Sequence, residues 1–141
     1  MKRFGSPQVE LLETMQTFDG CTRRQLRSLA PHLEEVRVPS GEQVVTEGSP
    51  GYHAFVLAEG LAHASIEGHR IATIQPGSFF GEVALLDGEP RSATVTTALP
   101  SRLLIFDRRA FDVLLRTAPA VAQRVMRDMA KRLRHADEQL G

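Results

Sequence analysis

The chain has 141 residues, which is long enough for one domain with a hydrophobic core and too short for two domains of ordinary size. Its 17 basic and 17 acidic residues cancel, so no overall charge attracts nucleic acid or an anionic membrane. Hydrophobic residues make up an ordinary 42% of the chain, and no apolar run approaches the roughly 20 residues that a membrane span requires.

Two short helices are predicted at the N-terminal end, within residues 7–31. Apolar residues recur at helical spacing between Val9 and Met15. The segment from Thr22 to Gln25 has the form of a capping box, in which side chains at both ends satisfy the free backbone N–H groups of a helix start. Pro31 is expected to end the second helix.

Residues 33–106 are predicted to form short antiparallel strands. Turn residues recur at a spacing of about 8–12 residues, which is typical of a β-sandwich or jelly roll and not of a parallel sheet. The turn signals are Gly41, Gly48, Pro50-Gly51, Gly60, Gly68, Pro76-Gly77 and Gly88-Glu89-Pro90. Residues 61–74 are interpreted as a hairpin that turns near Glu67-Gly68.

Two further helices are predicted within residues 107–140. Asp107 is placed as an N-cap, with Phe106 and Phe111 positioned to close a hydrophobic staple around it. Pro119 suits the first position of the second helix. That helix carries an apolar residue every four positions, at Val121, Val125, Met129 and Leu133.

The apolar stripe of the last helix has three uses that the sequence leaves open: packing on the strands, covering the apolar part of a bound ligand, or pairing with a second copy in a homodimer. The other faces of the helix carry five basic side chains, Arg124, Arg127, Lys131, Arg132 and Arg134. Acidic residues are interspersed among them, so these faces are interpreted as solvated and not as a nucleic-acid-binding stripe.

The segment from Phe79 to Val95 is the most informative part of the chain. A short apolar run that can form one helical turn separates Gly81-Glu82 from Arg91. The start of such a turn offers unpaired N–H groups to an anion, and an arginine adds a planar fork of donors suited to phosphate. Glu82 is an acceptor, which beside a phosphate suits a sugar hydroxyl. These residues together predict a site for a ribose phosphate.

This segment resembles the phosphate-binding cassette of cyclic nucleotide-binding domains, whose pattern is F-G-E-x-A-L followed by P-R-[S/T/A]-A-[T/S]-V. The matching positions are Phe80, Gly81, Glu82, Ala84, Leu85, Pro90, Arg91, Ser92, Ala93, Thr94 and Val95. The family's turn spacing is reproduced over nearly the whole chain. One departure is Tyr52-His53-Ala54, where many relatives carry an Asp after the glycine and a Met or Leu two further on. The departure is expected to lie in a hairpin and to affect the detail of that loop, not the pocket.

The resemblance implies the fold class and the boundaries. The fold is expected to be mainly β with flanking helices: a β-jelly-roll (double-stranded β-helix) barrel at 33–106, N-terminal helices at 7–31 and two C-terminal helices at 107–140. Residues 1–141 are then a single cyclic nucleotide-binding domain, with the phosphate-binding cassette at 79–95.

The resemblance also implies the ligand and its contacts. The ligand is expected to be cAMP in preference to cGMP, with Arg91 on the exocyclic phosphate oxygens and Glu82 on the ribose 2′-hydroxyl. Gly81 allows close backbone approach, and Ser92 adds a hydroxyl. The predicted site comprises Phe80, Gly81, Glu82, Val83, Ala84, Arg91, Ser92 and Ala93. Two alternatives give these residues no role in ligand binding: Arg91 pairs with Glu82 or Glu89 across the loop, and the Ser92 hydroxyl contacts only solvent.

Catalysis and metal binding find no support in the sequence. His63 and His69 flank one hairpin without a third ligand at metal spacing, and no serine lies in a nucleophile elbow. The lone Cys21 has no evident base beside it, and its presence without a disulfide partner suits a reducing cytoplasm. The chain is therefore expected to be a cytoplasmic sensor with no enzyme activity, metal or cofactor.

The effector partner is left unidentified by the sequence. The chain is interpreted as a stand-alone small regulator or an excised module. Two rival interpretations remain: a regulatory part of a larger transcription factor, channel or enzyme, and an interaction domain that keeps the barrel but has lost its ligand.

Overall fold

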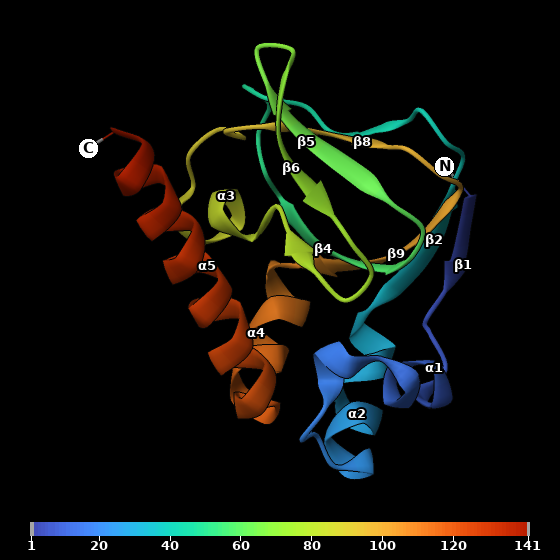
Figure 1. Cartoon of the computed structure of the whole chain (residues 1–141). Helices are drawn as coiled ribbons and strands as arrows, with labels where there is room; N and C mark the ends of the chain where they lie inside the picture. Colours follow the sequence, from blue (N-terminus) through green and yellow to red (C-terminus); the bar gives the residue numbers. More distant parts are fainter. Residues whose placement is uncertain (1, 141) are drawn as a thin grey trace.

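Two antiparallel sheets face each other in the computed structural model, which describes the backbone of residues 2–140 and the side chains of residues 3–134 (Figure 1). The first sheet has the order β1-β2-β9-β4-β7: β1 (Lys2–Gly5), β2 (Glu34–Val38), β9 (Ser101–Asp107), β4 (His53–Glu59) and β7 (Phe79–Phe80). The second has the order β3-β8-β5-β6: β3 (Gln43–Val45), β8 (Thr94–Thr97), β5 (Ala62–Ile66) and β6 (His69–Ile74). The predicted jelly roll with flanking helices is confirmed.

The hydrophobic core has two parts, which lie on opposite faces of the first sheet. Along β9, Leu103 and Ile105 point between the sheets, whereas Leu104 and Phe106 point toward the helices. Successive strand residues face opposite sides, so a strand covered on both faces is apolar at every position. This explains the uninterrupted run of apolar residues from Leu103 to Phe106. The residues of this run that face the helices hold the helices against the barrel.

The N-terminal helices follow the predicted segment with one break. They are α1 (Val9–Thr14), the 3-10 turn η1 (Gln16–Phe18), α2 (Arg23–Leu29) and the 3-10 turn η2 (Ala30–His32). The predicted capping box is confirmed: the Thr22 hydroxyl accepts from the Gln25 N–H, and the Gln25 side chain accepts from the Thr22 N–H. Met15 is extended, with φ −93° and ψ 127°, so the first helix is split there.

Strand β1 was not predicted from the sequence. It pairs antiparallel with β2, with Lys2 opposite Arg37 and Arg3 opposite Val36. The pairing extends the first sheet by one edge strand. An ion pair between Arg3 and Glu34 at 3.1 Å supports it on the exposed face.

The C-terminal helices are α4 (Arg108–Thr117) and α5 (Pro119–Leu140). The Asp107 carboxylate accepts the Ala110 N–H at 2.8 Å, and the rings of Phe106 and Phe111 meet edge to face, so the predicted cap and staple are confirmed. Among the described residues, no helix is both long and apolar enough to span a membrane.

The apolar stripe on α5 packs against the core as far as Met129, which is half-buried against the same cluster. Val121 and Val125 are buried among the other helices, whereas the Leu133 side chain is 66% exposed. The second half of α5 continues past α4 and runs alongside α3 (Glu82–Asp87), as Figure 1 shows. This part of the helix lies beside the predicted cassette.

Candidate functional site

The cassette begins with a single short helix between two left-handed glycines. Gly81, at φ 78°, is the N-cap of α3, and Gly88, at φ 73°, ends it with an N–H that donates to the Ala84 carbonyl. Such φ values favour glycine because the other residues have a Cβ that clashes with the backbone. The predicted helical turn and its break at Gly88 are confirmed.

Arg91 is buried beneath this turn, with a side chain that is only 8% exposed. Its Nη1 donates to the Gly81 carbonyl at 2.6 Å, and its Nη2 donates to the His53 carbonyl at 2.7 Å. The alternative that Arg91 pairs with Glu82 or Glu89 is therefore wrong. Burial lowers the pKa of Arg91 from its ordinary value, but a guanidinium stays charged at neutral pH.

The guanidinium of Arg91 retains donors for a ligand. Arginine has five N–H donors, and the two carbonyls use two of them. The backbone of Arg91 is also held in place, since its N–H donates to the Ser49 carbonyl and its carbonyl accepts from the Gly48 N–H, both at 2.8 Å. A positioned cation with free donors suits an anionic oxygen.

Glu82 is fully buried and its two carboxylate oxygens have different surroundings. Oε1 accepts a hydrogen bond from Nη2 of Arg132, which lies on α5. Oε2 is buried as well, and no described residue donates to it. A buried acceptor without a donor is costly, so its presence indicates a place for a ligand hydroxyl or a water molecule.

The remaining predicted residues divide into buried and exposed groups. The ring of Phe80 stacks on that of Phe55 at 5.1 Å, and Ala84 is buried against the loop before β4. Ala93 is half-buried, whereas Ser92 and Val83 are exposed, Val83 by 41%. The structure thus brings Phe80, Gly81, Glu82, Ala84 and Arg91 together and leaves Val83 and Ser92 at the surface.

Three contributors were not singled out from the sequence: Gly51, the His53 carbonyl and Arg132. A Cβ on Gly51 would lie 2.4 Å from the Ala84 Cβ and 3.0 Å from Arg91 Cζ. Gly51 was recognised only as part of a turn, and a backbone carbonyl has no sequence signal. Arg132 was one of five basic residues on a helix, and nothing in the sequence distinguishes it from the other four.

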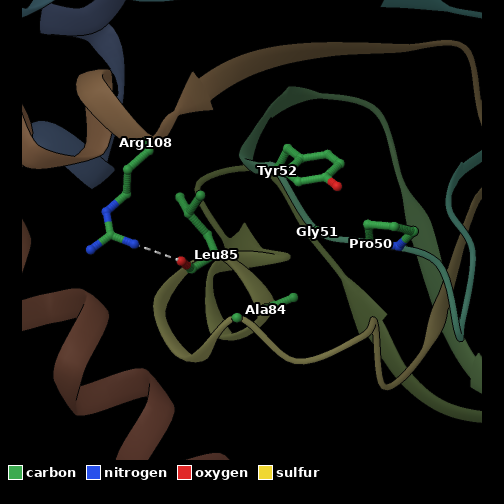
Figure 2. Close-up of a pocket in the computed structure, with 7 residues that line it drawn as sticks. Pro50, Gly51, Tyr52, Ala84, Leu85 and Arg108 are labelled. Atoms are coloured by element: carbon green, nitrogen blue, oxygen red, sulfur yellow. Dashed lines mark hydrogen bonds between the residues drawn. The ribbon is translucent and has the colours of Figure 1, made fainter.

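Among the described residues, two cavities lie near the candidate site, and neither is lined by Glu82 or Arg91. One, of about 280 Å³, lies between the loop at Pro50–Tyr52, α3 and Arg108, whose guanidinium donates to the Leu85 carbonyl (Figure 2). The other, of about 680 Å³, lies between the N-terminal helices, the turn at Pro76–Ser78 and Arg124. We place the candidate site at Glu82 and Arg91 because these two residues carry the relevant chemistry.

The described residues contain no group of three or more His, Cys, Asp or Glu side chains that could hold a metal ion. The site instead combines a buried arginine, a buried carboxylate with a free oxygen and a glycine at the backbone turn. A guanidinium donates to phosphate oxygens and a carboxylate accepts from a hydroxyl, so these groups have the chemistry that a phosphate and a hydroxyl on one small molecule require.

A jelly roll with this cassette defines a small-ligand-binding module. The family model described as "Cyclic nucleotide-binding domain" matches residues 35–118, which is more than half of the chain. The chain belongs to the cyclic nucleotide-binding domain family.

Similar proteins include members of several functional classes. The chain is 33% identical over 126 residues to the acetyltransferase Pat of Mycolicibacterium smegmatis, covering 86% of this chain and 38% of that protein. It is 26% identical over 136 residues to a CRP-like cAMP-activated global transcriptional regulator of Mycobacterium tuberculosis, covering 93% of this chain and 61% of the regulator. The catabolite activator protein of Thermus thermophilus superposes with a TM-score of 0.76 at 28% identity, over 88% of this chain and 61% of the other. The chain thus spans only part of the length of each.

Proposed function

We propose that this domain binds cAMP, in preference to cGMP, at the cassette formed by residues 79–95. One observation carries the proposal: Glu82 is fully buried, and its Oε2 has no donor among the described residues. A ribose 2′-hydroxyl would supply that donor. The similar regulator from Mycobacterium tuberculosis is described as cAMP-activated, which supports this choice of nucleotide.

Arg91 provides the second half of the proposed recognition. Its guanidinium is held by the carbonyls of Gly81 and His53, so its remaining N–H groups are fixed before the ligand arrives. Fixed donors lose little conformational entropy on binding, and bonds from a guanidinium to phosphate oxygens are charge-assisted. In this proposal Gly81, which has no side chain, lets the sugar lie close to the backbone. Ala84 borders the approach to the turn, and Phe80 supports the site from the core.

The proposed role of the module is regulatory. The described residues offer no nucleophile–base pair in the site, and a ligand can drive a change only by binding one conformation better than another. In this proposal residues 1–141 act as one sensor domain in the cytoplasm, and an effector protein or domain converts occupancy into an output. Pairing of two copies through α5 is a further part of the proposal.

A second candidate has its own support, namely the 33% identity to an acetyltransferase over most of this chain. In that case the module regulates an acyl-transfer domain on the same polypeptide, and the chemistry takes place outside these residues. A longer reading frame that encodes such a domain would favour this candidate.

Calorimetric titration of the purified chain with cAMP, cGMP and 5′-AMP tests the proposal. Tighter binding of cAMP than of cGMP is expected, with 5′-AMP weakest because its phosphate is not closed onto the ribose. Since ligand binds only the native state, cAMP at a hundred times its dissociation constant should raise stability by about 2.7 kcal/mol. A melting curve that does not move in millimolar cAMP would contradict the proposal.

A further inference from the structure

A reciprocal pair of hydrogen bonds joins the start of β8 to the loop before β4. The Glu47 N–H donates to Thr94 Oγ1 at 3.0 Å, and the Thr94 hydroxyl donates to Glu47 Oε1 at 3.2 Å. A hydroxyl can accept and donate at the same time, and here it does both toward one residue. Thr94 is the first residue of β8 and is only 8% exposed, so the pair is partly shielded from water.

This pair continues the contact between β3 and β8 toward the candidate site. Next to it, the Gly48 N–H donates to the Arg91 carbonyl and the Arg91 N–H donates to the Ser49 carbonyl, both at 2.8 Å. Glu47, Gly48 and Ser49 therefore face the segment from Arg91 to Thr94 along its length. The side chain of Glu47 holds the far end of this contact, and the backbone of Gly48 and Ser49 holds Arg91 itself.

Arg91 depends on such contacts because it lies in a loop. Residues 88–93, between α3 and β8, form neither a helix nor a strand. A shift in the backbone of this loop is carried to the end of the arginine side chain. The guanidinium nevertheless lies within 2.6 Å of the Gly81 carbonyl and 2.7 Å of the His53 carbonyl. Anchoring the end of the loop at Glu47 limits the displacement of Arg91.

The Glu47 carboxylate is itself oriented by the tip of the β5–β6 hairpin. The Glu67 N–H donates to Glu47 Oε1 at 3.1 Å and to Oε2 at 3.3 Å. Glu67 has φ 49°, in the left-handed region that residues with a side chain seldom adopt, and this turn directs its N–H toward Glu47. A carboxylate that is held by the hairpin has less freedom to turn away from Thr94.

We propose that Glu47 is a positioning residue for nucleotide recognition: it bridges the hairpin tip and the start of β8, and it thereby fixes the loop from which Arg91 reaches the phosphate. This inference rests on the proposed function, because it assigns the guanidinium of Arg91 to the phosphate. Glu47 acts through Arg91 and not by contact with the ligand. Without the Glu47 side chain, Thr94 loses its acceptor and the loop before it moves more freely. Arg91 then spends less time in the orientation that the phosphate requires.

The expected effects distinguish this role from a purely structural one. Glu47→Ala should weaken cAMP by about tenfold, a loss in the range for a hydrogen bond in a protein. In an Arg91→Lys background, Glu47→Ala should have little further effect, because the guanidinium through which it acts is already gone. A purely structural role would weaken binding by the same factor in both backgrounds. Glu47→Gln keeps an oxygen acceptor for Thr94 and should restore part of the affinity.

The first test is a double-substitution cycle, with cAMP titrated into the 141-residue chain. The variants are Glu47→Ala, Arg91→Lys and the two combined. Thr94→Val removes the partner hydroxyl without changing any charge, and it should reproduce the loss. Its control is Thr96→Val, two residues further along the same strand, which should leave the affinity unchanged. Circular dichroism verifies folding, and Thr94→Val decides the question if Glu47→Ala does not fold.

Amide hydrogen exchange of the ligand-free chain provides a second test that does not depend on cAMP. The N–H groups of Gly48 and Arg91 should exchange faster in Glu47→Ala, whereas those of β2 and β9 in the other sheet should keep their rates. If the unsubstituted chain binds no cAMP, the proposed function is overturned, and the role of Glu47 in recognition with it. If the chain binds cAMP but the Arg91 N–H exchanges at an unchanged rate, or the loss of affinity is equal in the two backgrounds, only the role of Glu47 is overturned.

Discussion

Gly51 and Ala84 approach each other so closely that a Cβ on Gly51 would lie 2.4 Å from that of Ala84. The same Cβ would lie 3.0 Å from both Cζ and Nε of Arg91. The contact joins the loop before β4 to α3 and to the buried arginine. The backbone φ of Gly51 is not positive, so glycine is needed here for space and not for conformation.

Gly51→Ala is therefore expected to push α3 or the Arg91 guanidinium out of place. Overpacking of this kind costs about 1–3 kcal/mol of stability, and the displaced arginine should also weaken cAMP binding. Calorimetry and a melting curve measure the two effects. Gly68→Ala is the control: Gly68 has φ +82° with open space around it, so that substitution should cost stability while the affinity stays the same.

Arg91→Ala should weaken cAMP by about 2–5 kcal/mol, because it removes charge-assisted donors from a phosphate. The substitution should also affect the fold, since the carbonyls of Gly81 and His53 would lose their donor in a partly buried part of the site. A loss of about 1–3 kcal/mol in stability, seen as a melting temperature lower by several degrees, should accompany the loss of binding.

The matched control for Arg91→Ala is Arg70→Ala, on the exposed face of β6. It removes the same charge from the chain and should change neither the affinity nor the melting temperature measurably. Unchanged affinity in Arg91→Ala would mean that the phosphate is held by other groups.

The cassette was predictable because its residues are contiguous. The order of Gly81, Glu82, Gly88 and Arg91 sets a local turn, and local geometry depends on neighbours in the sequence. The jelly roll followed from regularly spaced turn residues for a similar reason. Caps such as Thr22 with Gln25 are likewise contained within four residues.

The long-range contacts could not be predicted in this way. The choice of Arg132 among five basic residues depends on how far α5 is rotated and where it passes α3, and packing in the core sets both. Strand β1 was missed because two of the four residues 2–5 are charged and one is glycine, and because their pairing with β2 spans about thirty residues. The fit of Gly51 against Ala84 depends on two segments meeting in space.

Glu82→Gln should weaken cAMP more than 2′-deoxy-cAMP. The neutral amide is a poorer acceptor for the 2′-hydroxyl, and a hydrogen bond to a charged group contributes about 1.5–3 kcal/mol, so the difference between the two ligands is measurable by titration. Glu89→Gln, at an exposed position of the same loop, is the control and should affect neither ligand. Equal losses for both ligands would assign Glu82 a structural role instead.

Cys21 should react slowly with iodoacetamide. Partial burial raises the pKa of its thiol, although the nearby Arg124 acts in the opposite direction. Because the thiolate is the reactive form, a raised pKa reduces its fraction at pH 8 and moves the rise in rate to higher pH. The rate followed by mass spectrometry should increase on unfolding in urea. A folded rate equal to the unfolded one would show that burial does not protect the thiol.

Truncation after Ala130 should weaken cAMP binding while the fold persists. A cut after Thr117 would remove Val121 and Val125 from the core, so it would test folding more than binding. A cut after Ala130 keeps both valines and removes Arg132 together with the exposed Leu133.

If Leu133 covers the base of the bound nucleotide, burying about 100 Å² of apolar surface there would contribute about 2.5 kcal/mol. The truncated chain should then bind more weakly than Arg132→Gln, and Leu133→Ala in the full chain should show the apolar part alone. Hydrogen exchange of α5 on cAMP addition provides an independent measure, with increased protection expected around Arg132. If the truncated chain binds as tightly as the full chain, the second half of α5 has no part in recognition and the response to ligand is confined to the cassette.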